Sequence, residues 1–418
     1  AMKRILLNIV AMALCATMVQ AADPTATNYT MRECEGSYMP YPDVKSVEAC
    51  PDSLEPVMIN HIGRHGARFP SSEKNIKAVL EAVARAEAAG QLTSTGRKLR
   101  NLCNTIKAAT AGRWGALNSL GETEQAAIAT RMAKAWPTLF DGGRVEAIAS
   151  YSPRAIMSMY CFTHRLARIN NKLEIYTSSG RQNSKLLRPF DSDTFYHEYR
   201  EEGRWREPLT ALEAQMLTGA PLKRAFGSTF DDADPSEMRE LVMNEYSVVA
   251  CAAAAGVETD ASEFFARDEY NAAWSVSNLR HYLQYSASTL SMAPVDMAAD
   301  LLRELIDTTG DNGNCHVRLR FGHAETLMPL LAMMHIPGCY YMTNYFDTVA
   351  MHWRDFNIVP MAANLQLILL KHKQNGRLYL RVDLNEKPVP LIPARTAIYT
   401  PWEVAREYLT RCLPLLYQ

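Results

Sequence analysis

The nine residues RHGARFPSS, which begin at Arg64, place two arginines and a histidine around a glycine, directly after the apolar run PVMINHI. The guanidinium groups of Arg64 and Arg68 are permanently charged, and their planar sets of donors suit a tetrahedral phosphate. Gly63 and Gly66 flank Arg64 and His65, and we expect the missing Cβ atoms to let backbone N–H groups approach an anion. The chemistry predicted for this stretch is therefore the binding of an anion, above all a phosphate.

The histidine inside this cationic group can do more than bind. An imidazole has an ordinary pKa of about 6.5, and neighbouring positive charge lowers it, which leaves His65 neutral with a free lone pair. Neutral imidazole is a nucleophile that can carry a transferred group covalently. His61 and His65 are also spaced like two metal ligands on a helix, but a strand followed by a glycine loop is predicted here, and arginines repel a cation. A metal site is therefore disfavoured.

Polar residues follow an apolar strand at two further places. SYSPR, which ends at Arg154, follows residues 145–149, and GHAE, which contains His323, Ala324 and Glu325, follows residues 317–321. Both lead into helical patterns, and a helix is likewise expected to begin near Pro70. Strand-then-helix units build parallel α/β sheets, whose ligands lie beyond the carboxyl ends of the strands. The three junctions are therefore predicted to meet at one edge of such a sheet.

The helical period replaces strand patterns between the second and third junctions. We expect an α/β core over residues 23–201, an inserted helical domain over residues 202–307, and the rest of the core over residues 308–418. In the last part, Asn375-Gly376 predicts a type I′ turn between two strands. A final helix is expected from about Thr400 to Glu403 onward.

The first 22 residues have the layout of a secretory signal peptide: Lys3 and Arg4, an apolar stretch, and then small residues. A membrane anchor is the alternative. We expect removal of this leader, no membrane anchor in the mature form, and a periplasmic or secreted bacterial protein. With 44 basic and 45 acidic residues, the net charge of −1 provides no field that would attract nucleic acid.

Eight cysteines follow the leader, at positions 34, 50, 103, 161, 251, 315, 339 and 412. An even number in an oxidising compartment is consistent with some disulfides, whereas buried free thiols are the other interpretation of several of them. Their spacing contains no CxxC, so a zinc ribbon is disfavoured.

Most of the chain after the leader resembles the histidine phosphatases, in the branch that contains acid phosphatases and phytases. RHGARFP is similar to the signature of that branch, and the block from Ser150 to Ser158 is similar to the one that supplies a third phosphate-binding arginine. His323-Ala324-Glu325 departs from the His-Asp pair of common acid phosphatases and resembles the His-Ala-Glu of multiple inositol polyphosphate phosphatases. The resemblance implies a phosphoglycerate mutase-like α/β core with a helical insert.

The resemblance also implies roles for the residues. Arg64, Arg68, Arg154 and His323 would hold the phosphoryl oxygens, with Ala324 among the substrate-binding residues. His65 would attack phosphorus to form a phosphohistidine, and Glu325 would protonate the leaving oxygen and then assist hydrolysis. No metal or organic cofactor is needed in this scheme.

An inositol hexakisphosphate substrate needs more cations than one phosphate does. Arg181, Lys185 and Arg188 are candidates, and each has an ordinary surface charge as its alternative. The expected function is hydrolysis of inositol polyphosphates. The alternatives are a broad-specificity acid phosphatase acting on sugar phosphates, and a non-catalytic anion-binding protein on the same scaffold.

Overall fold

The computed structural model describes residues 27–310 and 315–417 of the 418-residue chain. The expected leader, residues 1–22, lies outside these described residues. Strands and helices alternate along the first part of the chain, then helices predominate, and strands return after residue 315.

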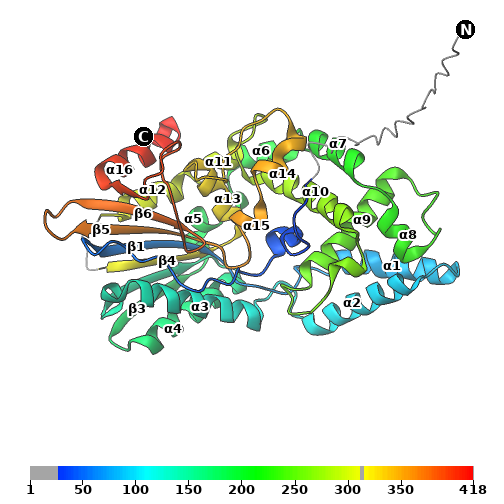
Figure 1. The fold of residues 1–418 in the computed structure, drawn as a ribbon, viewed down its shortest axis with the longest axis horizontal. Coiled ribbons are helices and arrows are strands. Elements are labelled where there is room, and N and C mark those ends of the chain that lie inside the picture. Colours follow the sequence, from blue (N-terminus) through cyan, green and yellow to red (C-terminus); the bar gives the residue numbers. More distant parts are fainter. Residues whose placement is uncertain (1–26, 311–314, 418) are drawn as a thin grey trace, which may run out of the picture.

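A central sheet has the strand order β3-β2-β4-β1-β5-β6-β7, with β8 paired to β6 (Figure 1). The strands are β1 (Leu54–Arg64), β2 (Gly143–Ala149), β3 (Leu173–Ser179), β4 (Cys315–Gly322), β5 (Asn364–His372), β6 (Leu378–Leu384), β7 (Lys387–Val389) and β8 (Tyr399–Pro401). The strands β3, β2, β4 and β1 are parallel, whereas β5 to β8 are added antiparallel. The expected parallel sheet is thus confirmed in the half that carries the three junctions.

Helices cover both faces of this sheet, which explains why every residue of β1 from Met58 to Arg64 is buried, without alternation. On one face lie α3 (Ser119–Ala135) and α4 (Pro153–Ile169), whose apolar side chains pack on β1, β2 and β4. On the other face lie α12 (Ala299–Thr308), α13 (Ala324–Met333) and α16 (Trp402–Cys412) (Figure 1). The last of these begins where the sequence predicts it.

Most of the remaining long helices form a second layer beside the sheet, seen on the right of Figure 1. From the stretch 202–307 come α7 (Arg206–Met216), α8 (Ala220–Phe226), α9 (Pro235–Cys251) and α10 (Arg267–Tyr285), and no strand of the sheet lies there. In addition, α1 (Lys74–Ala88) packs against α9 and α2 (Ser94–Thr110) packs against α8. The helical layer therefore also takes in residues that follow the first junction, which the sequence pattern does not indicate.

Two local predictions need correction. The hairpin between β5 and β6 is confirmed, but its turn is not type I′, which requires positive φ at both central residues. Only Gly376, at φ 71°, has it, and His372 N–H instead donates to Arg377 O over a longer loop. The eight cysteines among the described residues are all free thiols, so of the two interpretations left open, free thiols rather than disulfides are present.

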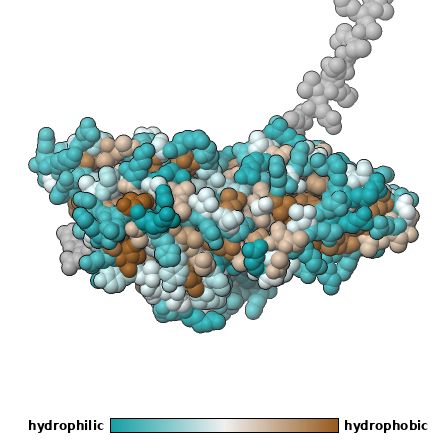
Figure 2. All heavy atoms as spheres, turned by 90° about the horizontal axis from the view of Figure 1, so that it is seen from below, coloured by the Kyte–Doolittle hydropathy of each residue, from teal (hydrophilic) through white to brown (hydrophobic). Residues whose placement is uncertain are grey.

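The outer surface is mixed in polarity. Figure 2 shows hydrophilic side chains interspersed with small, separate hydrophobic groups on one face. Among residues 27–310 and 315–417, no helix combines the length and apolar character that crossing a membrane requires.

Candidate active site

The three strand-to-helix junctions meet at the carboxyl edge of the parallel strands. The strand β4 lies between β2 and β1, and its register pairs Gly322 with Arg64 and Phe321 with Ala149. The residues that follow these strand ends are therefore neighbours in space, although they are more than 80 positions apart in the chain. The edge predicted from the sequence is present.

The backbone of His65 is held on both sides. Its N–H donates to Gly322 O at 3.1 Å, and its carbonyl accepts from Ala362 N–H at 3.0 Å. The ring Nδ1 lies 2.9 Å from Gly66 O, and because a carbonyl only accepts, the proton is on Nδ1. The lone pair is consequently on Nε2, where a nucleophile needs it.

Burial is the main reason that His65 is neutral. It lowers the pKa of His65 well below the usual 6.5, and the charges of Arg64, Arg154 and Arg68 lower it further. The direction matches the expectation from the sequence, but the larger cause is loss of water rather than neighbouring charge.

Three arginines surround this histidine with donors that have no acceptor. The Nε atoms of Arg64, Arg68 and Arg154 are all buried and have no hydrogen-bond partner among the described residues. Burial and mutual repulsion lower the pKa of both Arg64 and Arg154 to about 10. Buried donors are nearly always paired, so the donors of this cluster are suited to binding an anion.

One further nitrogen of each of Arg64 and Arg68, Nη1, is anchored by backbone carbonyls. Arg64 Nη1 donates to Ser37 O at 2.6 Å and also to Val359 O. Arg68 Nη1 donates to Phe69 O at 2.9 Å. These bonds fix where each guanidinium points before any ligand arrives.

A second histidine lies beside the first. The rings of His65 and His323 meet edge to face with centroids 5.6 Å apart. His323 Nε2 lies 3.0 Å from Arg188 Nη1 and 2.9 Å from Ser150 Oγ. An arginine can only donate, so Nε2 accepts and Nδ1 carries the proton. Burial, with Arg154 and Arg188, lowers the pKa of His323 well below its usual value, so this ring is also neutral.

Glu325 is the acidic residue near these arginines and histidines. It lies in the first turn of α13 and is partly exposed. Its charge partly offsets the fall in the pKa of Arg64 and Arg154, so its carboxylate is among these guanidinium groups. No described residue donates a hydrogen bond to it, which leaves both oxygens available to a ligand or a proton.

The family follows from comparison with known proteins. The family described as histidine phosphatase superfamily (branch 2) matches residues 57–385, which is most of the chain. The chain belongs to this family. It is therefore a histidine-type phosphatase, and the resemblance noted from RHGARFP is confirmed.

Individual relatives are more distant. The chain is 24% identical over 389 residues to human multiple inositol polyphosphate phosphatase 1, which covers 85% of this chain and 79% of the human protein. The multiple inositol polyphosphate phosphatase of Bifidobacterium longum, in its complex with inositol hexasulfate, superposes with a TM-score of 0.74 at 18% identity. That match covers 92% of this chain and 99% of the other. The phytase from D. castellii gives a TM-score of 0.69 at 16% identity, over 94% and 88% of the two chains.

The three cations expected to contact further phosphates, Arg181, Lys185 and Arg188, do not all lie at the site. Arg188 is at the site, where it contacts His323, and its guanidinium also stacks on the rings of Tyr151 and Phe190. The guanidinium of Arg181 also lies over the Tyr151 ring, 4.4 Å from its centre, and Arg181 is exposed. Lys185 instead pairs with Asp300 of α12 at 3.1 Å, so its charge is paired with a carboxylate that is not part of the arginine cluster.

Gly66 allows close backbone packing and does not present its N–H to an anion, which was the role expected of it. A Cβ on Gly66 would lie 2.5 Å from Gly121 O, so glycine is needed for backbone to pack on backbone. Gly66 N–H donates to Ser158 Oγ at 3.1 Å rather than pointing at an anion. The expected presentation of this N–H to a ligand is therefore wrong.

The helix after RHGARFP also begins later than expected. Phe69 N–H donates to Ala116 O at 3.0 Å, and Gly115 N–H donates to Pro70 O at 2.7 Å. These bonds hold the segment extended past Pro70, and α1 begins only at Lys74. The start of this helix is thus four residues away from the predicted one.

Several buried polar residues that support the loop were not identified from the sequence. Glu124 accepts from Ala67 N–H at 2.7 Å, and Gln125 Nε2 donates to Arg64 O at 3.0 Å. Both are in α3, on a face that packs on the core, where polar residues are unusual. That pattern is the signal that could have identified them, together with Ser150 in the second junction.

Proposed function

We propose that this histidine phosphatase is an exported phosphomonoesterase that hydrolyses inositol polyphosphates, phytate (InsP6) included, to lower inositol phosphates and phosphate. The observation that carries the proposal is the cluster of three guanidinium groups with buried, unpaired Nε–H donors around a neutral His65. A phosphate monoester would supply oxygens that accept from these donors and would place phosphorus beside the imidazole.

The proposed reaction proceeds in two displacements. His65 Nε2 attacks phosphorus, the bond from phosphorus to the inositol oxygen breaks, and Glu325 gives a proton to that oxygen. Arg64, Arg68, Arg154 and His323 Nδ1–H stabilise the charge on the phosphoryl oxygens. A water molecule, which loses its proton to Glu325, then attacks phosphorus, and the bond from phosphorus to His65 Nε2 breaks to release phosphate.

The preference for inositol polyphosphates rests on the cations beside this cluster and on the relatives. Arg188 is anchored to Asp191 and to aromatic rings, and Arg181 shares the Tyr151 ring with it, so two further charges lie near the first phosphate. The human relative is a multiple inositol polyphosphate phosphatase, and the Bifidobacterium relative was solved with inositol hexasulfate. Lys185, an expected substrate contact, is not part of the proposal.

A panel of phosphate esters tests this specificity. We expect kcat/KM for inositol hexakisphosphate to exceed kcat/KM for sugar monophosphates, because only the former can engage Arg181 and Arg188 as well as the cluster. Equal values, or a preference for sugar phosphates, would support the broad-specificity acid phosphatase instead. A protein that binds phosphate but releases none from any ester would support the non-catalytic alternative.

Export is part of the same proposal and rests on residues 1–22 alone. Fractionation of cells that express the full chain should find the shortened protein in the periplasm or the medium. Retention of the full-length chain in membranes would favour the anchor alternative.

A further inference from the structure

The segment from Asp355 to Ala363 lies directly behind the phosphate-binding loop. Arg64 N–H donates to Ala363 O at 2.7 Å, and His65 O accepts from Ala362 N–H at 3.0 Å. The Arg64 side chain reaches the same segment, because its Nη1 donates to Val359 O. This segment therefore holds both the backbone and the guanidinium of the first arginine.

Asp355, at the start of this segment, is a buried carboxylate that accepts hydrogen bonds from three donors on two elements. Oδ1 accepts from Trp274 Nε1–H at 2.9 Å. Oδ2 accepts from His281 Nδ1 at 2.8 Å and from Ser37 N–H at 3.2 Å. Trp274 and His281 belong to α10 of the helical layer, and Ser37 belongs to η1 (Glu33–Tyr38) near the start of the described chain.

The two carbonyls that hold Arg64 both belong to residues that Asp355 binds. Ser37 accepts from Arg64 through its oxygen and donates its own N–H to the Asp355 carboxylate. Val359 accepts from Arg64 through its oxygen and donates its own N–H to the Asp355 backbone carbonyl at 2.7 Å. One residue thus fixes both acceptors of a guanidinium that it does not contact.

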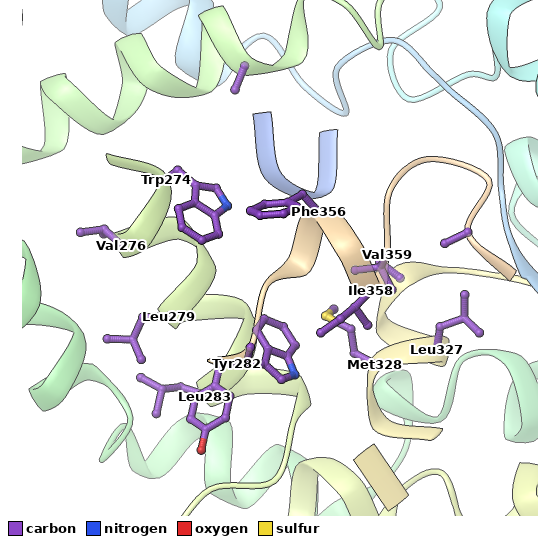
Figure 3. Packing of buried hydrophobic residues seen from close by; sticks show 14 of the residues in the cluster. Trp274, Val276, Leu279, Tyr282, Leu283, Leu327, Met328, Phe356, Ile358 and Val359 are labelled. Atoms are coloured by element: carbon purple, nitrogen blue, oxygen red, sulfur yellow. The ribbon is translucent and has the colours of Figure 1, made fainter. Parts of the chain in front are cut away.

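The local backbone is shaped for this arrangement. Gly36 has a φ of 61°, and a Cβ there would lie 3.0 Å from Trp274 Cδ1 and 3.1 Å from Asp355 Oδ2. Only glycine lets η1 come this close to the carboxylate. Figure 3 shows Trp274 beside Phe356, with ring centres 5.1 Å apart, and Ile358 and Val359 packed toward α13.

We propose that Asp355 is a positioning residue for Arg64, through which the helical layer sets the geometry of phosphate binding. An unanchored guanidinium on a long side chain has several rotamers, and only the one held by Ser37 and Val359 points its Nε–H into the cluster. The inference rests on the proposed function, since it assumes that the anion of this cluster is a phosphate.

The first test is Asp355→Asn, measured by titration of inorganic phosphate and by steady-state kinetics. Asparagine has the same shape, but its NH₂ would face an N–H donor, so the contacts to Ser37 or Trp274 must loosen. We expect a loss on the order of a hundredfold in kcat/KM, in line with a misplacement of about 1 Å, and a clearly weaker affinity for phosphate. Unchanged phosphate affinity and kcat/KM in the folded variant would overturn the proposal.

A second substitution distinguishes positioning from general loss of stability. In the double variant Asp355→Asn with Trp274→Phe, the indole N–H that opposes the new NH₂ is gone, so we expect roughly tenfold recovery of phosphate affinity over Asp355→Asn alone. A further loss instead of recovery would contradict the proposal. Should Asp355→Asn not fold, Trp274→Phe alone decides, with severalfold weaker phosphate binding expected and unchanged binding contradicting the inference.

Glu245→Gln is the matched control. Glu245 is an equally buried acid of the helical layer, in α9, and no described residue makes a hydrogen bond to its carboxylate. Its substitution should leave phosphate affinity unchanged, and a loss as large as that of Asp355→Asn would show that any replacement of a buried carboxyl group there disturbs the site. Phosphate titration does not depend on turnover. If the proposed hydrolysis of inositol phosphates is wrong, the wild type will be inactive on these esters, while the difference in phosphate affinity between wild type and Asp355→Asn will still be seen.

Discussion

The chemistry of the site depends on keeping two histidines neutral among fixed positive charges. Because burial and the arginines both disfavour protonation, His65 and His323 keep their lone pairs and N–H groups in defined places. The same burial makes the unpaired Nε–H groups of the arginines costly until an anion arrives. The proposed anion binding and the proposed attack by His65 thus depend on the same feature, which is a buried imidazole among three arginines.

Glu325 is expected to act as the acid, and the effect of its loss should depend on the leaving group. An inositol alkoxide needs a proton as the P–O bond breaks, whereas p-nitrophenolate leaves readily without one. For Glu325→Gln we predict a fall of roughly 10²- to 10⁴-fold in the phosphorylation rate with inositol phosphates, and a much smaller fall with p-nitrophenyl phosphate.

Pre-steady-state kinetics are the measurement for this prediction, because slow hydrolysis of the phosphohistidine could mask the difference in steady state. Wild type measured with both esters is the control. Equal losses on both esters would mean that Glu325 orients the substrate and that another group donates the proton.

At the level of elements, the loop after β1 is held by close backbone contact with α3. A Cβ on Gly66 would come within 2.5 Å of Gly121 O, and backbone cannot move aside cheaply. Gly66→Ala should therefore destabilise the protein by about 1–3 kcal/mol, the usual cost of overpacking, as measured by the midpoint of urea unfolding.

Gly219→Ala is the comparison for this variant. There the nearest atom to a new Cβ is Met238 Cγ at 3.7 Å, an ordinary contact, so we expect a change within about 0.5 kcal/mol. Equal midpoints for Gly66→Ala and Gly219→Ala would show that the loop can shift away from α3.

Sequence reasoning succeeded where an element is specified by its own residues. The three strand-to-helix junctions combine an apolar run with polar residues and a helix start, so β1, β2 and β4 were predicted with their site residues. It failed where distant backbone decides. Pairing of Phe69 and Pro70 with residues 115–116 delays α1, and nothing near Pro70 in the sequence signals it.

The same limit applies to side chains that choose between partners. Lys185 and Arg188 are three residues apart and equally cationic, yet one pairs with Asp300 of α12 and the other contacts His323. Only the placement of α12 and α13 decides between them. The role of residues 355–363 was likewise hidden, because it uses backbone carbonyls.

For the molecule as a whole, a buried acid in the helical layer makes stability depend on pH. Burial raises the pKa of Glu245 to about 8, whereas a carboxyl in the unfolded chain titrates near 4.3. The folded state thus binds the proton more tightly, so this group's contribution to stability is full below about pH 4.3 and is lost as the pH rises to about 8.

Glu245→Gln should remove this dependence, because glutamine does not titrate. From pH 5 to pH 7 we expect the free energy of unfolding of the wild type to fall relative to the variant by on the order of 2–3 kcal/mol, measured by urea unfolding at each pH. Parallel curves for the two proteins would mean that Glu245 is ionised and solvated in the folded state.

The most direct test of the whole account is rapid-quench trapping of the phosphorylated enzyme. Wild type mixed with radiolabelled inositol phosphate should show acid-labile phosphate on His65, formed at least as fast as turnover, and His65→Ala should show none while it keeps part of its phosphate affinity. The account is contradicted if no phosphohistidine forms during turnover, or if His65→Ala keeps more than about a hundredth of the wild-type kcat, a loss smaller than even an auxiliary acid–base group usually causes.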